Sequence, residues 1–139
     1  MIGHDRGMIE LLGFHHVAVT VRDCDASAAW YASVLGFEEV FREESEERRG
    51  CVMRFPGGNW GVGLVEHTAT APDDGFDPVR LGLDHLAFTV ASQEALEAYA
   101  EHLTAAAVES SGPFFSPRGG ILNFKDPDGI ALAVFWDRT

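Results

Sequence analysis

The sequence contains one strand-like segment twice, and this internal repeat limits the architecture more than any other feature. His16-Val-Ala-Val-Thr-Val21 recurs as His85-Leu-Ala-Phe-Thr-Val90, and each copy runs into a stretch with helical spacing of apolar residues. Self-similarity at a fixed offset indicates a fold built from equivalent units. We therefore expect one domain made of two modules.

The alternation of side chains within the repeat indicates which face of each strand is open. Successive side chains of a strand point to opposite faces, so each copy places a histidine, an alanine and a threonine on one face and larger apolar residues on the other. The apolar face suits packing beneath a helix, whereas the smaller and partly polar face suits the lining of a concave site. His16, Ala18, His85 and Ala87 are therefore candidate ligand-pocket residues.

The composition excludes several classes of partner. The chain has 139 residues, of which 46% are hydrophobic, and this is enough for one globular domain. Its formal charge of −12 repels nucleic acid and anionic membrane surfaces, so we expect neither as a partner. It has no apolar run of about 18 residues and no secretory signal, which predicts a cytoplasmic protein. Cys24 and Cys51 follow no C-x-x-C pattern and are expected to be buried thiols.

Each module is predicted to contain one helix and four strands. Asp23 or Asp25 caps a helix over 26–35, which ends at Gly36, and Ser92 caps the helix of the second module. The charged segment 42–49 is expected to be a solvated turn between two strands. The predicted strands cover residues 14–21, 37–42, 51–55 and 60–66 in the first module and 83–90, 108–115, 121–124 and 130–136 in the second.

These elements divide the chain into a tail and a single domain. The tail is expected over 1–11 and the domain over 12–139. Within the domain, the first module covers about 12–67, a connector about 68–81 and the second module about 82–139.

Four motifs, together with the paired βαβββ order, resemble the vicinal oxygen chelate superfamily, which includes glyoxalase I, bleomycin and fosfomycin resistance proteins and extradiol dioxygenases. The resemblance implies an α+β fold in which each of two tandem βαβββ modules forms a half-barrel, a curved mixed sheet with helices outside. It also implies a homodimer and leaves open whether the cups form within one chain or between two. The motifs are His16-Val-Ala-Val-Thr-Val-Arg-Asp23, Trp30-Tyr-x-x-Val-Leu-Gly-Phe37, Asp84-His-Leu-Ala-Phe-Thr-Val90 and Phe124-x-Asp-Pro-Asp-Gly-Ile130.

The resemblance further implies metal ligands at His16 and His85 and at a glutamate on the fourth strand of each module. The aligned positions hold Gly63 and Ala133 instead. Because stable catalytic sites usually supply three protein ligands, we expect no cofactor or a weakly held divalent metal. Two explanations of these small residues stay equally open: close strand packing, or an enlarged and more apolar cup that favours an organic ligand.

Two further kinds of residue are expected near this cup. Phe135 has the same strand parity as Ala133 and is expected to wall the pocket. Arg54 and Arg118 lie close enough to pair with an anionic ligand, although surface solvation is the preferred explanation for each.

Three functions remain open. The preferred one is metal-independent binding or sequestration of a small organic ligand, as the resemblance to bleomycin resistance proteins implies. The first alternative is a divalent-metal-dependent, glyoxalase-like lyase or isomerase, or a dioxygenase, that uses His16 and His85. The second is a metal-free enzyme in which His16 or His85 is the general base. Whether the chain is an enzyme, and what its ligand is, stay open.

Overall fold

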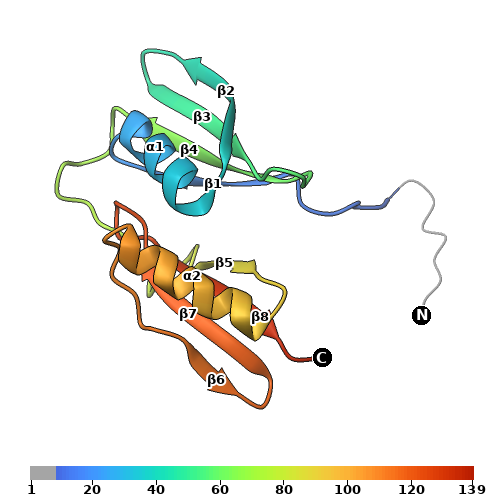
Figure 1. Ribbon diagram of the computed structural model, residues 1–139. Helices are drawn as coiled ribbons and strands as arrows, with labels where there is room; N and C mark the ends of the chain where they lie inside the picture. Colours follow the sequence, from blue (N-terminus) through green and yellow to red (C-terminus); the bar gives the residue numbers. More distant parts are fainter. Residues whose placement is uncertain (1–8) are drawn as a thin grey trace.

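The computed structural model describes residues 9–139 and contains the two predicted βαβββ modules (Figure 1). Residues 1–8 of the predicted tail lie outside the described residues. The first module consists of β1 (His16–Thr20), α1 (Cys24–Leu35), β2 (Glu38–Glu44), β3 (Arg48–Arg54) and β4 (Gly61–His67). The second consists of β5 (Leu86–Thr89), α2 (Gln93–Ala105), β6 (Phe114–Ser116), β7 (Gly119–Lys125) and β8 (Ala131–Asp137).

Each module forms one four-stranded mixed sheet. The strand orders are β1-β4-β3-β2 and β5-β8-β7-β6. The first strand of each module runs parallel to the fourth, and the other neighbours are antiparallel. Neither sheet closes on itself, so the predicted α+β class with tandem, unclosed sheets is confirmed.

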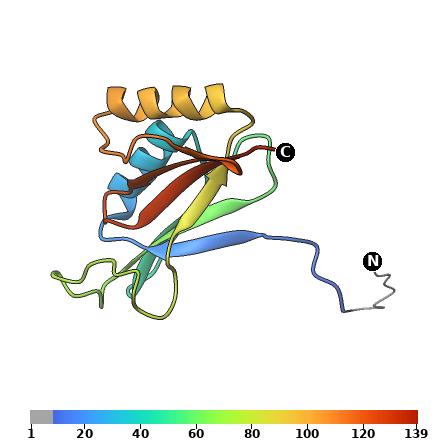
Figure 2. The ribbon, with the colours of Figure 1, turned by 90° about the horizontal axis from the view of Figure 1, so that it is seen from below.

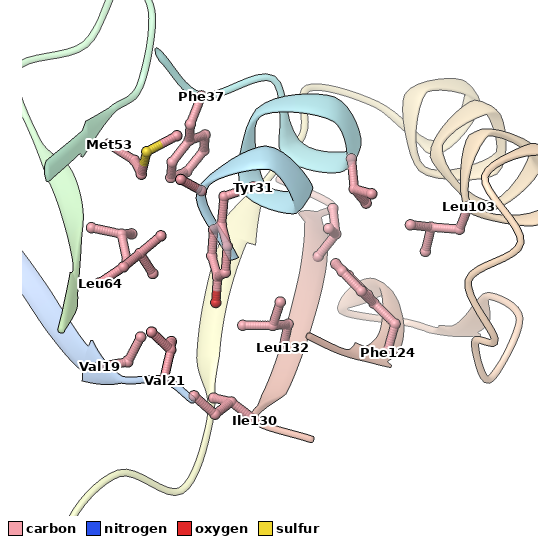
Figure 3. Close-up of a cluster of buried hydrophobic side chains, with 14 of the residues drawn as sticks. Val19, Val21, Tyr31, Phe37, Met53, Leu64, Leu103, Phe124, Ile130 and Leu132 are labelled. Atoms are coloured by element: carbon pink, nitrogen blue, oxygen red, sulfur yellow. The ribbon is translucent and has the colours of Figure 1, made fainter. Parts of the chain in front are cut away.

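The two helices lie on the same side of the sheets and share one hydrophobic core (Figures 1 and 2). Tyr31 of α1 points into the space between Leu64 of β4 and Leu132 of β8, so this helix packs against both modules (Figure 3). Tyr99 of α2 donates a hydrogen bond from Oη to the carbonyl oxygen of Val34 at 2.8 Å, which joins the two helices. Within residues 9–139, no helix covers the opposite face of either sheet.

Caps and turns account for the ends of α1. The carboxylate of Asp23 accepts a hydrogen bond from the backbone N–H of Ala26 at 3.0 Å, and Gly36 adopts a left-handed conformation with φ of 76°. Asp23 is therefore the cap, and Asp25 instead pairs with Arg42 and Arg49. Cys24 and Cys51 are buried free thiols, as predicted.

The prediction of a solvated turn over 42–49 is wrong in its extent. β2 continues to Glu44 and β3 begins at Arg48, so the hairpin turn is confined to 45–47. The charged side chains form ion pairs, Arg48 with Glu43 of the hairpin and Arg49 with Asp25 of α1, and the backbone ladder continues beneath them.

The prediction of a strand over 108–115 is also wrong. Only a short β6 forms, with an isolated bridge between Ser110 and Phe124. Gly112 has φ of 71° and Pro113 lacks a backbone N–H, so these two residues interrupt the ladder between the Ser110 bridge and β6. β1 and β5 are likewise shorter than predicted, and β1 begins at His16 because its register partner Gly61 is the first residue of β4.

The turn between β7 and β8 also connects the modules. The buried carboxylate of Asp126 accepts hydrogen bonds from Tyr31 Oη and from the backbone N–H of Ile130, each at 2.9 Å. Arg22, which follows β1, forms an ion pair with Asp128 at 3.0 Å. Neither helix of the described part of the chain has the length and hydrophobicity that crossing a bilayer requires.

Candidate functional site

The sheet faces opposite the helices form the candidate site. All residues of β2 and β6 are exposed, as are His16 and Ala18 on β1. Two large apolar side chains on these strands are exposed: Phe41 is 57% exposed and Phe114 is 59% exposed. Such uncovered apolar surface is typical of a ligand-binding or subunit-binding face.

Gly63 lies at the centre of the open face of the first sheet. It pairs with Ala18 on one side and with Val52 on the other. A Cβ atom at this position would lie 3.2 Å from Cβ of Ala18 and 3.8 Å from Cδ2 of His16. A longer side chain at Gly63 would therefore stand beside the His16 imidazole.

The second sheet repeats this arrangement at Ala133. This residue pairs with Ala87 on β5 and with Asn123 on β7, and it is only 1% exposed. The register thus gives the two modules matching positions, Ala18 beside Gly63 and Ala87 beside Ala133. Both positions beside the first strand carry a residue without a carboxylate.

Each candidate histidine has one ring nitrogen already in contact with a neighbour. Nδ1 of His16 lies 2.8 Å from Nδ1 of His15, and Nδ1 of His85 lies 2.8 Å from Oδ1 of Asp84. These contacts leave Nε2 of His16 and of His85 available to a ligand, a metal or a proton. Sequence analysis missed both partners, although each one directly precedes its histidine in the chain.

The two histidines line different hollows of the single chain. His16 and Ala87 line a hollow of about 410 Å³ between β1 and β5, which therefore takes residues from both modules. His85 lines another hollow, of about 680 Å³, together with Asn123 and Lys125. One chain therefore does not place His16 and His85 in a common hollow.

The remaining predicted pocket residues are distributed in the same way. Ala18 lines a hollow of about 320 Å³ that the connector partly covers, and Phe135 lines one of about 270 Å³ beside Phe114 and Arg118. Gly63 and Ala133 line none of these four hollows. The seven candidates thus share two sheet faces rather than one cavity.

An aromatic stack walls the hollow that contains His16. Trp60 stacks on Phe55, with ring centroids 5.1 Å apart, and on Phe88 of the second module at 5.9 Å. Phe37 meets the Trp60 ring edge-on at 5.6 Å. These contacts hold the Trp60 ring in place and give the hollow an apolar wall. Sequence analysis could not identify Phe88 as the neighbour of Trp60, because this contact joins the two modules.

The residues present do not fit a divalent metal site within one chain. Among residues 9–139, no group of three or more histidine, cysteine, aspartate or glutamate side chains is arranged to hold a metal ion. His16 and His85 lie in separate hollows, and Gly63 and Ala133 supply no oxygen ligand. Two neutral imidazoles without a third ligand make an incomplete set.

Comparisons with known proteins agree with this architecture. The family model described as Glyoxalase/Bleomycin resistance protein/Dioxygenase superfamily matches residues 13–134. The uncharacterized protein YaeR of Escherichia coli (strain K12) is 30% identical over 132 residues, which cover 92% of this chain and 98% of YaeR. A glyoxylase/bleomycin resistance protein/dioxygenase domain from Frankia sp. EAN1pec is 37% identical in sequence, with a TM-score of 0.85, and the match covers 93% of this chain and 100% of that domain.

Two more distant structures share the fold. TnmS3, an antibiotic binding protein from Streptomyces sp. CB03234, is 18% identical with a TM-score of 0.72, and the match covers 94% of this chain and 99% of TnmS3. The fosfomycin resistance protein FosX from Listeria monocytogenes is 18% identical with a TM-score of 0.71, covering 93% of this chain and 94% of FosX. A mutant of FosX has been solved in complex with Mn(II). The repeat, the paired sheets and the family match together show that this chain belongs to the Glyoxalase/Bleomycin resistance protein/Dioxygenase superfamily.

Proposed function

We propose that this protein binds a small organic ligand on the open faces of its sheets, without a complete resident metal site. The observation that carries the proposal is the absence of a carboxylate at Gly63 and Ala133, beside the strands that bear the histidines. The apolar hollow around His16 and Trp60 supplies a surface that suits an organic molecule. TnmS3, a structural neighbour, is an antibiotic binding protein, which is consistent with sequestration of this kind.

We further propose that two copies of the chain complete the cups. His16 and His85 line separate hollows within one chain, and large apolar side chains remain exposed on both open faces. Pairing the first sheet of one copy with the second sheet of the other would cover Phe41 and Phe114 and enclose a ligand. Analytical ultracentrifugation of the full chain is expected to show a dimer, and a monomer at every concentration would contradict this arrangement.

Elemental analysis tests the proposal for the metal. The purified protein is expected to hold a substoichiometric amount of divalent metal, and brief chelation should leave its ligand binding unchanged. One tightly held metal ion per site, with ligand binding lost on chelation, would overturn the proposal in favour of a metal-dependent lyase, isomerase or dioxygenase.

A second candidate function is supported by the contact between Asp84 and His85. A carboxylate 2.8 Å from Nδ1 orients the ring and leaves Nε2 free to accept a proton, which suits a metal-free general base. This function predicts turnover that survives chelation and is lost in His85→Ala. Unchanged turnover in that variant would exclude His85 as the base.

A further inference from the structure

Arg54 lies in line with His16 on the open face of the first sheet. Gly61 pairs with His16 on β1 and with Arg54 on β3, so the three residues form one row across three strands. Paired residues of neighbouring strands point to the same face, and two strand spacings separate the outer residues by about 10 Å. A Cβ atom at Gly61 would lie 2.5 Å from the backbone oxygen of Met53, so only glycine fits here and no side chain of β4 separates the imidazole from the guanidinium.

No carboxylate neutralises Arg54 within residues 9–139. Glu38 lies opposite it in the register of β2 and β3 but forms no ion pair with it. In contrast, Arg42, Arg48 and Arg49 on the same hairpin all pair with acids. Among the described arginines of this hairpin, Arg54 alone forms no ion pair, which leaves its charge available to a ligand.

The second module carries a cation at the matching position. Arg54 and Lys125 each stand two residues before the proline of their module's turn. Lys125 pairs with Ala131 and lines the same hollow as His85. Lys125 also forms no ion pair within the described part of the chain. Both copies of the repeat therefore combine a histidine, a small residue and an unpaired cation.

The hollow beside this row is apolar. Its lining includes Phe14, Trp60 and Phe88, and the polar side chains that the described residues contribute to it are those of His16 and Asn59. Its volume of about 410 Å³ lies within the range of about 300–1,000 Å³ that is usual for small-molecule pockets. The site therefore has a cationic end, at Arg54 of the row, and an apolar part, which is the hollow.

We infer that the ligand is an organic anion, in which an apolar or aromatic body enters the hollow beside Trp60 and a carboxylate, sulfonate or phosphonate group pairs with Arg54. The planar guanidinium suits such groups because its N–H donors match two oxygen atoms at once. This inference rests on the proposed function, and it names the chemical class of ligand for the same site. It revises the preference for surface solvation at Arg54.

A matched pair of fluorescent probes tests the inference on the full chain. 1-Anilinonaphthalene-8-sulfonate and N-phenyl-1-naphthylamine share one aromatic body, and only the first carries an anionic group. Affinities from fluorescence titration are compared for wild type, Arg54→Gln and Arg80→Gln. Arg80 is an exposed connector residue without an ion pair among residues 9–139, so its variant removes the same charge away from the row.

The expected result is selective. Arg54→Gln should weaken binding of the sulfonate by about three- to tenfold, the range for one partly exposed ion pair, and added salt should weaken binding only in the two proteins that keep Arg54. Arg80→Gln should bind the sulfonate like wild type, and all three proteins should bind the neutral probe equally. Arg54→Lys should restore part of the sulfonate affinity.

Two other outcomes are distinguishable. If the neutral probe binds but Arg54→Gln and Arg80→Gln leave sulfonate affinity unchanged, or reduce it equally, the anionic class is wrong and the proposed ligand site stands. If wild type binds neither probe, the apolar site of the proposed function fails, and this inference fails with it.

Discussion

At the scale of single residues, Gly63 and Ala133 are the positions that decide what the histidines can do. A Cβ at Gly63 would lie 3.8 Å from the His16 ring, so a glutamate there would bring a carboxylate to the imidazole. The 3.2 Å approach to Ala18 requires a shift of a few tenths of an ångström, which Ala18 can supply because β1 is the edge strand of its sheet.

The double variant Gly63→Glu with Ala133→Glu is therefore expected to bind Zn²⁺ or Ni²⁺ where the wild type does not. In the dimer proposed above, two histidines and two carboxylates would meet in one cup and complete a usual ligand set. Calorimetry measures the metal affinity of the double variant and of wild type. The gain should exceed the roughly 10- to 100-fold change in metal affinity that is usual for residues that only hydrogen-bond a metal ligand. Gly63→Gln with Ala133→Gln is the matched control, and equal metal binding by both double variants would contradict the prediction.

Asp126 makes stability depend on pH in a defined direction. Burial raises the pKa of Asp126 above its ordinary value of 3.8, although hydrogen bonds from Ile130 and Tyr31 oppose the shift. The folded protein then holds the proton more tightly than the unfolded chain does. The contribution of this carboxyl to the free energy of unfolding is thus full below about pH 3.8 and is lost as the pH rises through the folded-state pKa.

Wild type is accordingly expected to lose stability relative to Asp126→Asn as the pH rises from about 4 to about 7. Each unit of pKa difference corresponds to about 1.4 kcal/mol. Urea unfolding of both proteins across this pH range measures the difference between their free energies of unfolding. The contributions of the other carboxyl groups cancel in this difference, because both proteins contain them. A difference that stays constant with pH would contradict the assignment.

Part of the candidate site could be predicted from single residues and their spacing. The period-two alternation put His16 and Ala18 on one face, and the register pairs Ala18 with Gly63 on that face. The sequence could not predict that His16 and His85 line separate hollows, because this depends on how the modules pack. The stack of Trp60 on Phe88 depends on the same packing.

At the scale of elements, local signals determined the helices well. Asp23, Gly36 and Ser92 occupy the cap positions that their side chains and backbone freedom suit. Strand ends were harder to predict, because a strand ends where its partner does. Charged residues of the β2–β3 hairpin continue the ladder by pairing with Asp25 of α1, which no local pattern reveals.

Asp23→Ala is expected to destabilise the protein by about 1 kcal/mol, because the backbone N–H of Ala26 loses its acceptor. Urea unfolding at neutral pH measures the change. Asp73→Ala removes the same charge from an exposed connector position and should stay within about 0.5 kcal/mol of wild type. Equal destabilisation by the two variants would indicate an effect of net charge instead of capping.

At the scale of the whole molecule, the two modules share one core and one buried hydrogen bond. Tyr31 of the first module donates to Asp126 of the second, and α1 packs against both sheets. The repeat predicted two equivalent units, but it contained no information on the contacts between them, since those contacts are made by residues that differ between the copies.

Tyr31→Phe is expected to lower the free energy of unfolding by about 1.5–3 kcal/mol, the usual cost of losing a hydrogen bond to a charged group. Arg22→Gln removes the side-chain ion pair to Asp128, and because Arg22 is 45% exposed the cost should be below about 1 kcal/mol. Urea unfolding ranks the two variants. A larger loss for Arg22→Gln would mean that the surface ion pair, rather than the buried bond, holds the modules together.

The parallel pairing of β1 with β4 also bears on synthesis of the chain. β4 lies between β1 and β3, so β1 has no partner within its own sheet until the segment from Gly61 to Val65 exists. A chain emerging from the ribosome thus carries β1 unpaired until the last strand of the first module has left the exit tunnel. The bond between Tyr31 and Asp126 forms later still, because nearly the whole second module must be translated first.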